Sequence, residues 1–98
     1  MALKTRPFDP AEFLDEDESI EAYLQESLAI ALEDSNLSVL TQALGAVARA
    51  RGMSQIAQAS GLSRESLYKS LSAEGNPEFG TVLRVMQAMG LKLTIQAA

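Results

Sequence analysis

The sequence predicts an all-helical protein of five helices, and three observations support this fold class. Apolar residues recur at the three- and four-residue spacing of amphipathic helices over most of residues 17 to 89. Residues that commonly begin or end helices interrupt this pattern, among them Asn36, Gly52, Ser63 and Gly90. The alternation typical of strands is confined to residues 2 to 8 and 91 to 95. At 98 residues the chain can enclose one modest core and is too short for two.

The first helix is expected from about residue 17 to 32. Before it, residues 2 to 8 contain Pro7, which favours an extended arm or an edge strand over a helix. The helix carries an apolar stripe at helical spacing, made of Ile20, Tyr23, Leu24, Ser27, Leu28, Ala31 and Leu32. We expect this stripe to face the core.

The second helix is expected from about residue 36 to 50. It would bury one apolar side chain in each turn, at Leu37, Leu40, Leu44 and Val47. Gly45 in its middle costs roughly 1 kcal/mol relative to alanine, so it indicates a close crossing with another element. Gly52 would end the helix. Arg49 and Arg51 lie in its last turn, either as cations that suit the helix dipole or as contacts to phosphate.

Residues 53 to 71 predict two short helices joined by a tight turn at Gly61. Such a turn requires a positive φ, which glycine adopts at little cost. Ser63 is a good N-cap for the second short helix, because its hydroxyl can accept a hydrogen bond from the amide of Glu65 or Ser66. The side chains expected to face a common core are Ile56, Leu62, Leu67 and Leu71.

The outward face of the second short helix is left with Arg64, Glu65, Tyr68 and Lys69. Two short helices with this core and this polar face form the pattern of a helix-turn-helix. In that motif the second helix enters the DNA major groove with its N-terminal residues toward the bases. A plain helical hairpin can show the same pattern. These two helices alone therefore do not distinguish a DNA-binding motif from a hairpin that only packs on the core.

The fifth helix is predicted from Pro77 to Met89. Gly75 would stand past the end of the preceding helix, and Asn76 would be the N-cap of the new one. Its apolar stripe consists of Phe79, Val82, Leu83, Met86 and Met89. Beyond it, residues 91 to 95 alternate in polarity and predict a short strand. A lone strand cannot satisfy its backbone groups, so its partner would be the N-terminal arm or the same strand of a second chain.

Charge is divided unevenly along the chain, whose formal net charge is −5. Residues 1 to 36 hold ten acidic and two basic residues, whereas residues 37 to 98 hold six basic and three acidic residues. We therefore expect one compact protein with an acidic N-terminal arm and helix, followed by a region that phosphate would not repel. Four consecutive acids either complement the start of the first helix or form a surface for a basic partner: Asp15, Glu16, Asp17 and Glu18.

Composition argues against several other function classes. The chain has no His and no Cys, which removes the commonest metal ligands and the commonest general base, so we expect neither an enzyme nor a bound metal or cofactor. No apolar run approaches the roughly 20 residues that span a bilayer. The N-terminus shows no basic, apolar signal peptide, so a cytoplasmic location is expected.

Three stretches, residues 43 to 54, 61 to 69 and 75 to 93, together carry a family resemblance, and the run from 47 to 69 is its most specific part. On these residues the chain resembles the addiction-module antidote family, HigA-like antitoxins with a Cro/repressor-type helix-turn-helix. The resemblance covers about residues 12 to 96. It implies a lambda-repressor-like DNA-binding domain, a small basic ribonuclease toxin of the RelE/HigB class as partner, and repression of the antitoxin's own operon.

The resemblance also implies roles for single residues. Base-edge contacts would come from Ser63, Arg64, Glu65, Tyr68 and Lys69. Phosphate contacts would come from the capping residues Ser54 and Asn76, together with Gln55. Binding to a two-fold operator implies a homodimer. The resemblance does not indicate which residues touch the toxin; the negative charge of residues 1 to 36 makes the four consecutive acids the candidate toxin-binding surface.

Two alternatives to an antitoxin are open at this point. One is a stand-alone repressor of phage type with no toxin, and the other is a protein-interaction domain that has lost DNA binding. Residues 1 to 36 are far more acidic than an extension for dimerisation on DNA needs to be, which favours the antitoxin over the stand-alone repressor.

Overall fold

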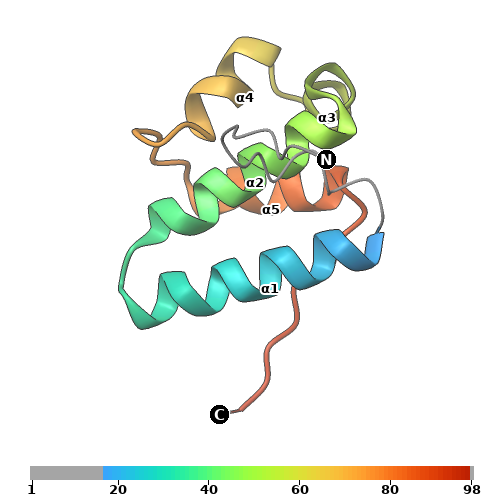
Figure 1. Ribbon diagram of the computed structural model, residues 1–98. Coiled ribbons are helices and arrows are strands. Elements are labelled where there is room, and N and C mark those ends of the chain that lie inside the picture. The colour runs from blue at the N-terminus through green and yellow to red at the C-terminus, as the bar shows by residue number, and fades with distance from the viewer. Residues whose placement is uncertain (1–16, 98) are drawn as a thin grey trace, which may run out of the picture.

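The computed structural model describes residues 17 to 97, and within them the chain forms five helices joined by short connections. The elements are α1 Asp17–Glu33, α2 Leu37–Arg51, α3 Met53–Ser60, α4 Arg64–Ser70 and α5 Phe79–Ala88. α1 and α2 pack side by side as a hairpin, while α3 and α4 lie on the side of α2 away from α1, and α5 packs against α3 (Figure 1). The predicted all-helical class with five helices is confirmed.

Part of the N-terminal prediction lies outside the described residues. This applies to the arm at residues 2 to 8 and to Asp15 and Glu16. Asp17 and Glu18 are described only as the first backbone positions of α1. The boundaries of α1 and α2 agree with the predicted helices within one or two residues, and Asn36 caps α2 by accepting a 3.2 Å hydrogen bond from the amide of Ser38.

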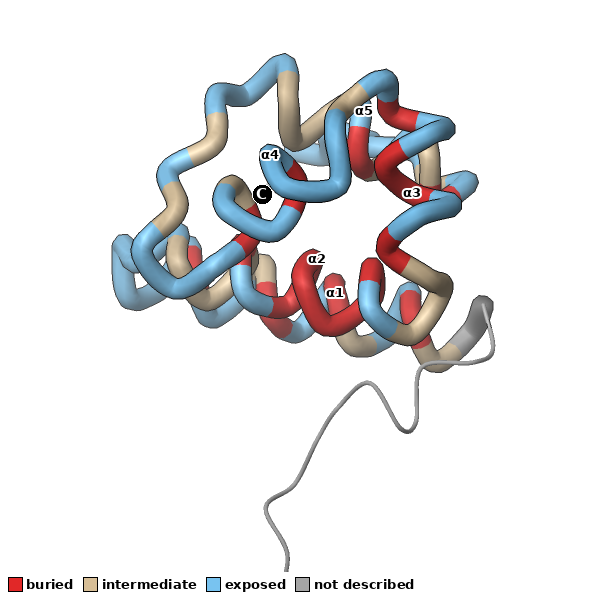
Figure 2. The backbone as a smooth tube through the Cα atoms, turned by 90° about the horizontal axis from the view of Figure 1, so that it is seen from above, coloured by how far each residue is buried: buried red, intermediate tan, exposed pale blue. Residues whose placement is uncertain are grey.

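The core is built around the middle of α2. Six consecutive α2 residues, 43 to 48, are buried, and four of them are glycine or alanine, whose small size lets neighbouring helices approach. The largest fully buried side chains come from α1, α2, α4 and α5: Ile20, Leu44, Val47, Leu67 and Val85. Seen from above, the buried segments gather along α2 and on the faces of the other helices that meet it (Figure 2).

Three apolar residues that the sequence predicted to be buried are exposed instead. Leu32 is 68% exposed, and Leu37 and Phe79 are each 66% exposed. All three lie in the first or last turn of a helix, where no neighbouring element in the described part of the chain covers them. Conversely, Val85 is fully buried although it was not in the predicted stripe of α5. The buried face of α5 is therefore turned toward Val85 rather than Phe79.

The predicted start of the fifth helix is wrong by two residues. α5 begins at Phe79 with Glu78 in the N-cap position, so Asn76 is not an N-cap and Pro77 is not the first helical residue. The reason lies just upstream, where a Cβ on Gly75 would clash with the carbonyl oxygens of Lys69 and Ser70. Because the chain packs tightly against the end of α4 at Gly75, residues 76 to 78 are needed to connect this turn to the start of α5.

The predicted C-terminal strand is not seen. Residues 91 to 97, which we call the C-terminal tail, form neither a helix nor a strand. The amide of Leu91 donates a 3.0 Å hydrogen bond to the carbonyl of Met86, and Gly90 has a positive φ of 76° that closes α5 as predicted. Beyond this point the tail runs past α1 and away from the helices (Figure 1). A strand needs a neighbour to pair with, and residues 17 to 97 offer none.

Candidate nucleic-acid interface

The turn between α3 and α4 is fixed by backbone hydrogen bonds that require its glycine. Gly61 has φ 78° and ψ 12°, in the left-handed region, as predicted. Its amide donates to the carbonyl of Gln58 at 3.4 Å, and the amide of Leu62 donates to the carbonyl of Ala57 at 3.1 Å. This pair of bonds is a Schellman motif, which satisfies the last carbonyls of α3 and redirects the chain at once into α4.

The start of α4 is fixed by a side-chain cap. The hydroxyl of Ser63 accepts a 3.0 Å hydrogen bond from the amide of Ser66, and the two hydroxyl oxygens are 2.9 Å apart in a second hydrogen bond. Ser63 is therefore the N-cap that the sequence predicted, with Ser66 as its partner. The cap sets where α4 begins and hence which residues occupy its first turn.

The inner face of α4 fixes its rotation. Leu67 is fully buried and Leu71 is 5% exposed, whereas Ser70 is only half-buried. On the α3 side, Ile56 is buried and Leu62 is half-buried, so the predicted inward-facing set is confirmed. This packing leaves the opposite face of α4 exposed, with Arg64, Glu65, Tyr68 and Lys69.

Two of these exposed side chains are organised relative to each other. The Arg64 guanidinium lies 5.7 Å from the centroid of the Tyr68 ring, and it donates a long hydrogen bond of 3.5 Å to the Tyr68 hydroxyl. The pair is one helical turn apart, so the contact needs no distortion of α4. The arrangement holds Arg64 over the aromatic ring and leaves its remaining donors available to an acceptor in front of α4.

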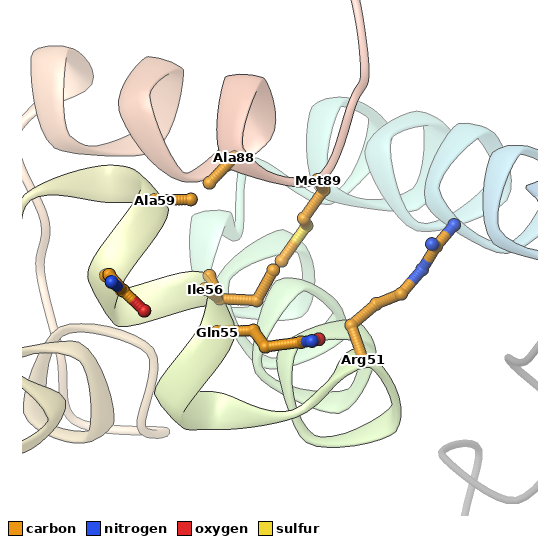
Figure 3. Close-up of a pocket in the computed structure, with 7 residues that line it drawn as sticks. Arg51, Gln55, Ile56, Ala59, Ala88 and Met89 are labelled. Carbon is orange, nitrogen blue, oxygen red and sulfur yellow. The ribbon is translucent and has the colours of Figure 1, made fainter.

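Polar side chains on α3 border a cavity of about 430 Å³ that lies between α3 and the end of α5 and that no residue of α4 lines. Gln55 and Gln58 line it together with Arg51, Ile56, Ala59, Ala88 and Met89 (Figure 3). Gln55 was a predicted contact residue, whereas Gln58 was not, although its position three residues after Gln55 places both on one side of α3. In Figure 3 the guanidinium of Arg51 points away from Gln55.

The two predicted phosphate contacts that rested on capping have no cap role. The N-cap of α3 is Gly52, with φ 103°, and Ser54 lies inside the first turn of the helix as an exposed residue. Asn76 is exposed as well, but it lines a different hollow, together with residues of α1 and α2. Every predicted DNA-contact residue except Asn76 therefore lies on α3, on α4 or at the N-cap of α4, and each of them is exposed.

Neither a metal-binding group of residues nor a membrane-spanning helix is found in the described part of the chain. Among residues 17 to 97 there is no group of three or more carboxylates that could hold a metal ion. No helix in this part of the chain is long and apolar enough to cross a membrane. The exposed polar side chains of α3 and α4 can offer hydrogen-bond donors and acceptors to a ligand that faces these two helices.

Comparison with known proteins gives two matches. A family model described as "Probable addiction module antidote protein" matches residues 4–97. A Haemophilus influenzae protein described as uncharacterized is 47% identical over 96 residues, which cover 98% of this chain and 95% of that protein. No solved structure matches the chain. The family match includes all five helices and every candidate residue named above.

Proposed function

Because the chain belongs to the addiction module antidote family, we propose that it is the antitoxin of a type II toxin-antitoxin module. It binds and neutralises a toxin of the RelE/HigB class and represses its own operon by sequence-specific DNA binding. Its role is regulatory and not enzymatic, as an antidote protein implies.

The single observation that carries the DNA-binding part of the proposal is the exposed face of α4. A short helix with its apolar side buried and Arg64, Tyr68 and Lys69 outward fits the recognition helix of a lambda-repressor-like helix-turn-helix. Arg64 lies in the first turn, where a bidentate contact to guanine is geometrically easy. Lys69 stands further along the helix and reaches a base or a phosphate.

The remaining contacts follow from the same docking. Ser63 and Glu65 face base edges from the first turn of α4, and Ser54 and Gln55 on the exposed side of α3 meet phosphate. Asn76 would contact phosphate only at the edge of the docked surface. Two such modules about 34 Å apart read a two-fold operator, so the protein acts as a homodimer.

The toxin-facing surface in this proposal is the acidic N-terminal third, with Asp15, Glu16, Asp17 and Glu18 at its centre. The described part of α1 and the residue after it add four exposed carboxylates, at Glu21, Glu26, Glu33 and Asp34. A basic toxin is steered toward a surface of this charge, while DNA is repelled by it. The two partners therefore use separate faces of the protein.

The test of the antitoxin proposal is a rescue experiment with the neighbouring reading frame, which we expect to encode a basic protein of about the same length. Expression of that protein alone should arrest growth, and co-expression of this chain should restore growth and yield a stable complex on purification. If the neighbouring protein is harmless and does not bind, while operator binding is intact, the chain is a stand-alone repressor instead.

A further inference from the structure

The side chain of Glu65 leaves α4 on the side opposite the core. Successive residues of an α-helix are turned by about 100° around its axis, so Glu65 lies about 200° from Leu67, which is fully buried. Lys69 lies about 200° from Leu67 in the other sense and is close to one helical turn from Glu65. Both charged side chains are exposed. Glu65 and Lys69 therefore form the central stripe of the exposed face of α4.

The carboxylate of Glu65 has no partner in the described part of the chain. Arg64 is its neighbour in sequence, but the guanidinium lies 5.7 Å from the centroid of the Tyr68 ring and donates a hydrogen bond to the Tyr68 hydroxyl. Lys69 is four residues away, a spacing at which glutamate and lysine often pair. Among residues 17 to 97, however, Glu65 forms no ion pair and accepts no side-chain hydrogen bond. It therefore presents a negative charge at the centre of the face that the proposed function places on DNA.

Only one kind of group on DNA satisfies a carboxylate in this position. Phosphates line the edges of the major groove and repel it, whereas the floor of the groove presents the edges of the bases. The donors on this floor are the exocyclic amino groups, N4 of cytosine and N6 of adenine. Adenine also presents the N7 acceptor beside its amino group, which opposes a carboxylate. Cytosine presents its amino group without a neighbouring acceptor of its own, so it is the better partner for Glu65.

We infer that Glu65 is a specificity-determining residue that selects a cytosine in the operator. Its carboxylate accepts a hydrogen bond from the N4 amino group of that cytosine. Thymine or guanine in the same position presents an oxygen acceptor, which leaves the carboxylate desolvated and repelled. The same charge weakens binding to non-operator DNA, so Glu65 discriminates by penalising the wrong sequences. This inference rests on the proposed DNA-binding function and assigns one base of its target.

The test selects binding sites from a random library of DNA duplexes with the wild type, Glu65→Gln, Glu65→Ala and the control Glu26→Gln. Glu26 is an exposed carboxylate on α1, which packs on the side of α2 away from α4, so the control removes the same charge elsewhere. At one position of each half-site, the wild type should prefer cytosine over thymine by about five- to 150-fold. Glu65→Gln should select adenine there, because an amide both accepts from N6 and donates to N7. Glu65→Ala should have no preference at that position and should bind non-operator DNA more tightly than wild type.

The outcomes separate this inference from the proposed function. A change confined to that one position, absent from Glu26→Gln and with the helix content of all variants unchanged, supports the inference. If both Glu65 variants keep the wild-type preference at every position, the carboxylate reads no base and the inference is overturned, while the proposed function stands. If the position that changes holds a base other than cytosine in the wild-type site, the assignment of cytosine is overturned. If the wild type binds DNA without sequence preference, or does not bind it, sequence-specific repression is overturned together with this inference.

Discussion

Gly45 of α2 lies directly against Leu71, the residue that ends α4. A Cβ built on Gly45 would stand 2.9 Å from the carbonyl oxygen of Leu71 and 3.5 Å from its Cβ. The close crossing that the sequence predicted at this glycine is therefore confirmed. Because the nearest atom belongs to the backbone, it cannot rotate away from an added methyl group. The contact fixes how closely α4 sits on α2.

Gly45→Ala should therefore destabilise the protein although alanine is the better helix former. The propensity gain of roughly 1 kcal/mol is offset by an overpacking cost of about 1 to 3 kcal/mol. We expect a net loss of up to about 2 kcal/mol, which urea unfolding followed by circular dichroism would measure. Gly80→Ala in α5 is the matched control, since nothing lies within 4 Å of a Cβ there, and it should not destabilise. Equal effects at both glycines would contradict the crossing.

The cap at Ser63 gives a second prediction about stability. Ser63→Ala removes the acceptor for the amide of Ser66 and should cost about 1 kcal/mol. Ser63→Asp restores an acceptor and adds favourable charge at the start of α4, so it should be close to wild type. Thermal unfolding of the two variants distinguishes them. An alanine variant as stable as the aspartate variant would show that the cap contributes nothing.

The residues that sequence reasoning placed correctly are those with a strict local requirement. Gly61 must adopt a positive φ and Ser63 must cap α4, and both requirements can be read from neighbouring residues alone. The crossing at Gly45 involves the distant Leu71, but it was predictable because glycine is costly inside a helix unless a close contact requires it. The outward face of α4 follows in turn, because its inner leucines leave only one rotation.

The failures concern features that depend on what surrounds an element. Phe79 and Leu37 fit an apolar stripe but lie at helix ends that nothing in the described chain covers. Asn76 and Pro77 form a good helix start, yet the tight packing of Gly75 on the end of α4 delays the helix. The C-terminal strand needs a partner, which one chain by itself does not provide within residues 17 to 97. Local patterns carry no information about such neighbours.

Contact between Arg64 and Tyr68 predicts that the tyrosine supports DNA binding through the arginine. An exposed cation–π contact is worth about 0.5 to 1 kcal/mol, so Tyr68→Ala should weaken operator binding by about two- to fivefold. Tyr68→Phe keeps the ring under the guanidinium and should lose less. Fluorescence anisotropy with labelled operator would measure both. If the Tyr68→Ala variant binds operator as tightly as wild type while the Arg64→Ala variant binds it weakly, Arg64 contributes to DNA binding without support from the Tyr68 ring.

Neutralising the four consecutive acids should slow toxin binding. Asp15, Glu16, Asp17 and Glu18 are replaced together by Asn and Gln, and the association rate is measured by stopped flow at low and high salt. We expect a slower rate at low salt and a weaker salt dependence, because electrostatic steering is screened by ions. The control neutralises Glu74 and Glu78, which are exposed outside the acidic third. A rate and salt dependence equal to wild type would move the toxin site elsewhere.

The most direct test of the account is operator affinity of the Arg64→Ala/Lys69→Ala variant across a range of salt concentrations. A bidentate arginine contact contributes roughly 1 to 3 kcal/mol, so the variant should lose at least about tenfold in affinity, with a shallower salt dependence. Arg84→Ala removes one positive charge, where the α4 variant removes two, from an exposed position on α5 and serves as the control. The account predicts near-normal binding by the control and a large loss by the α4 variant, with the helix content of both unchanged. Wild-type affinity in a folded Arg64→Ala/Lys69→Ala variant would contradict the assignment of α4 as the recognition helix.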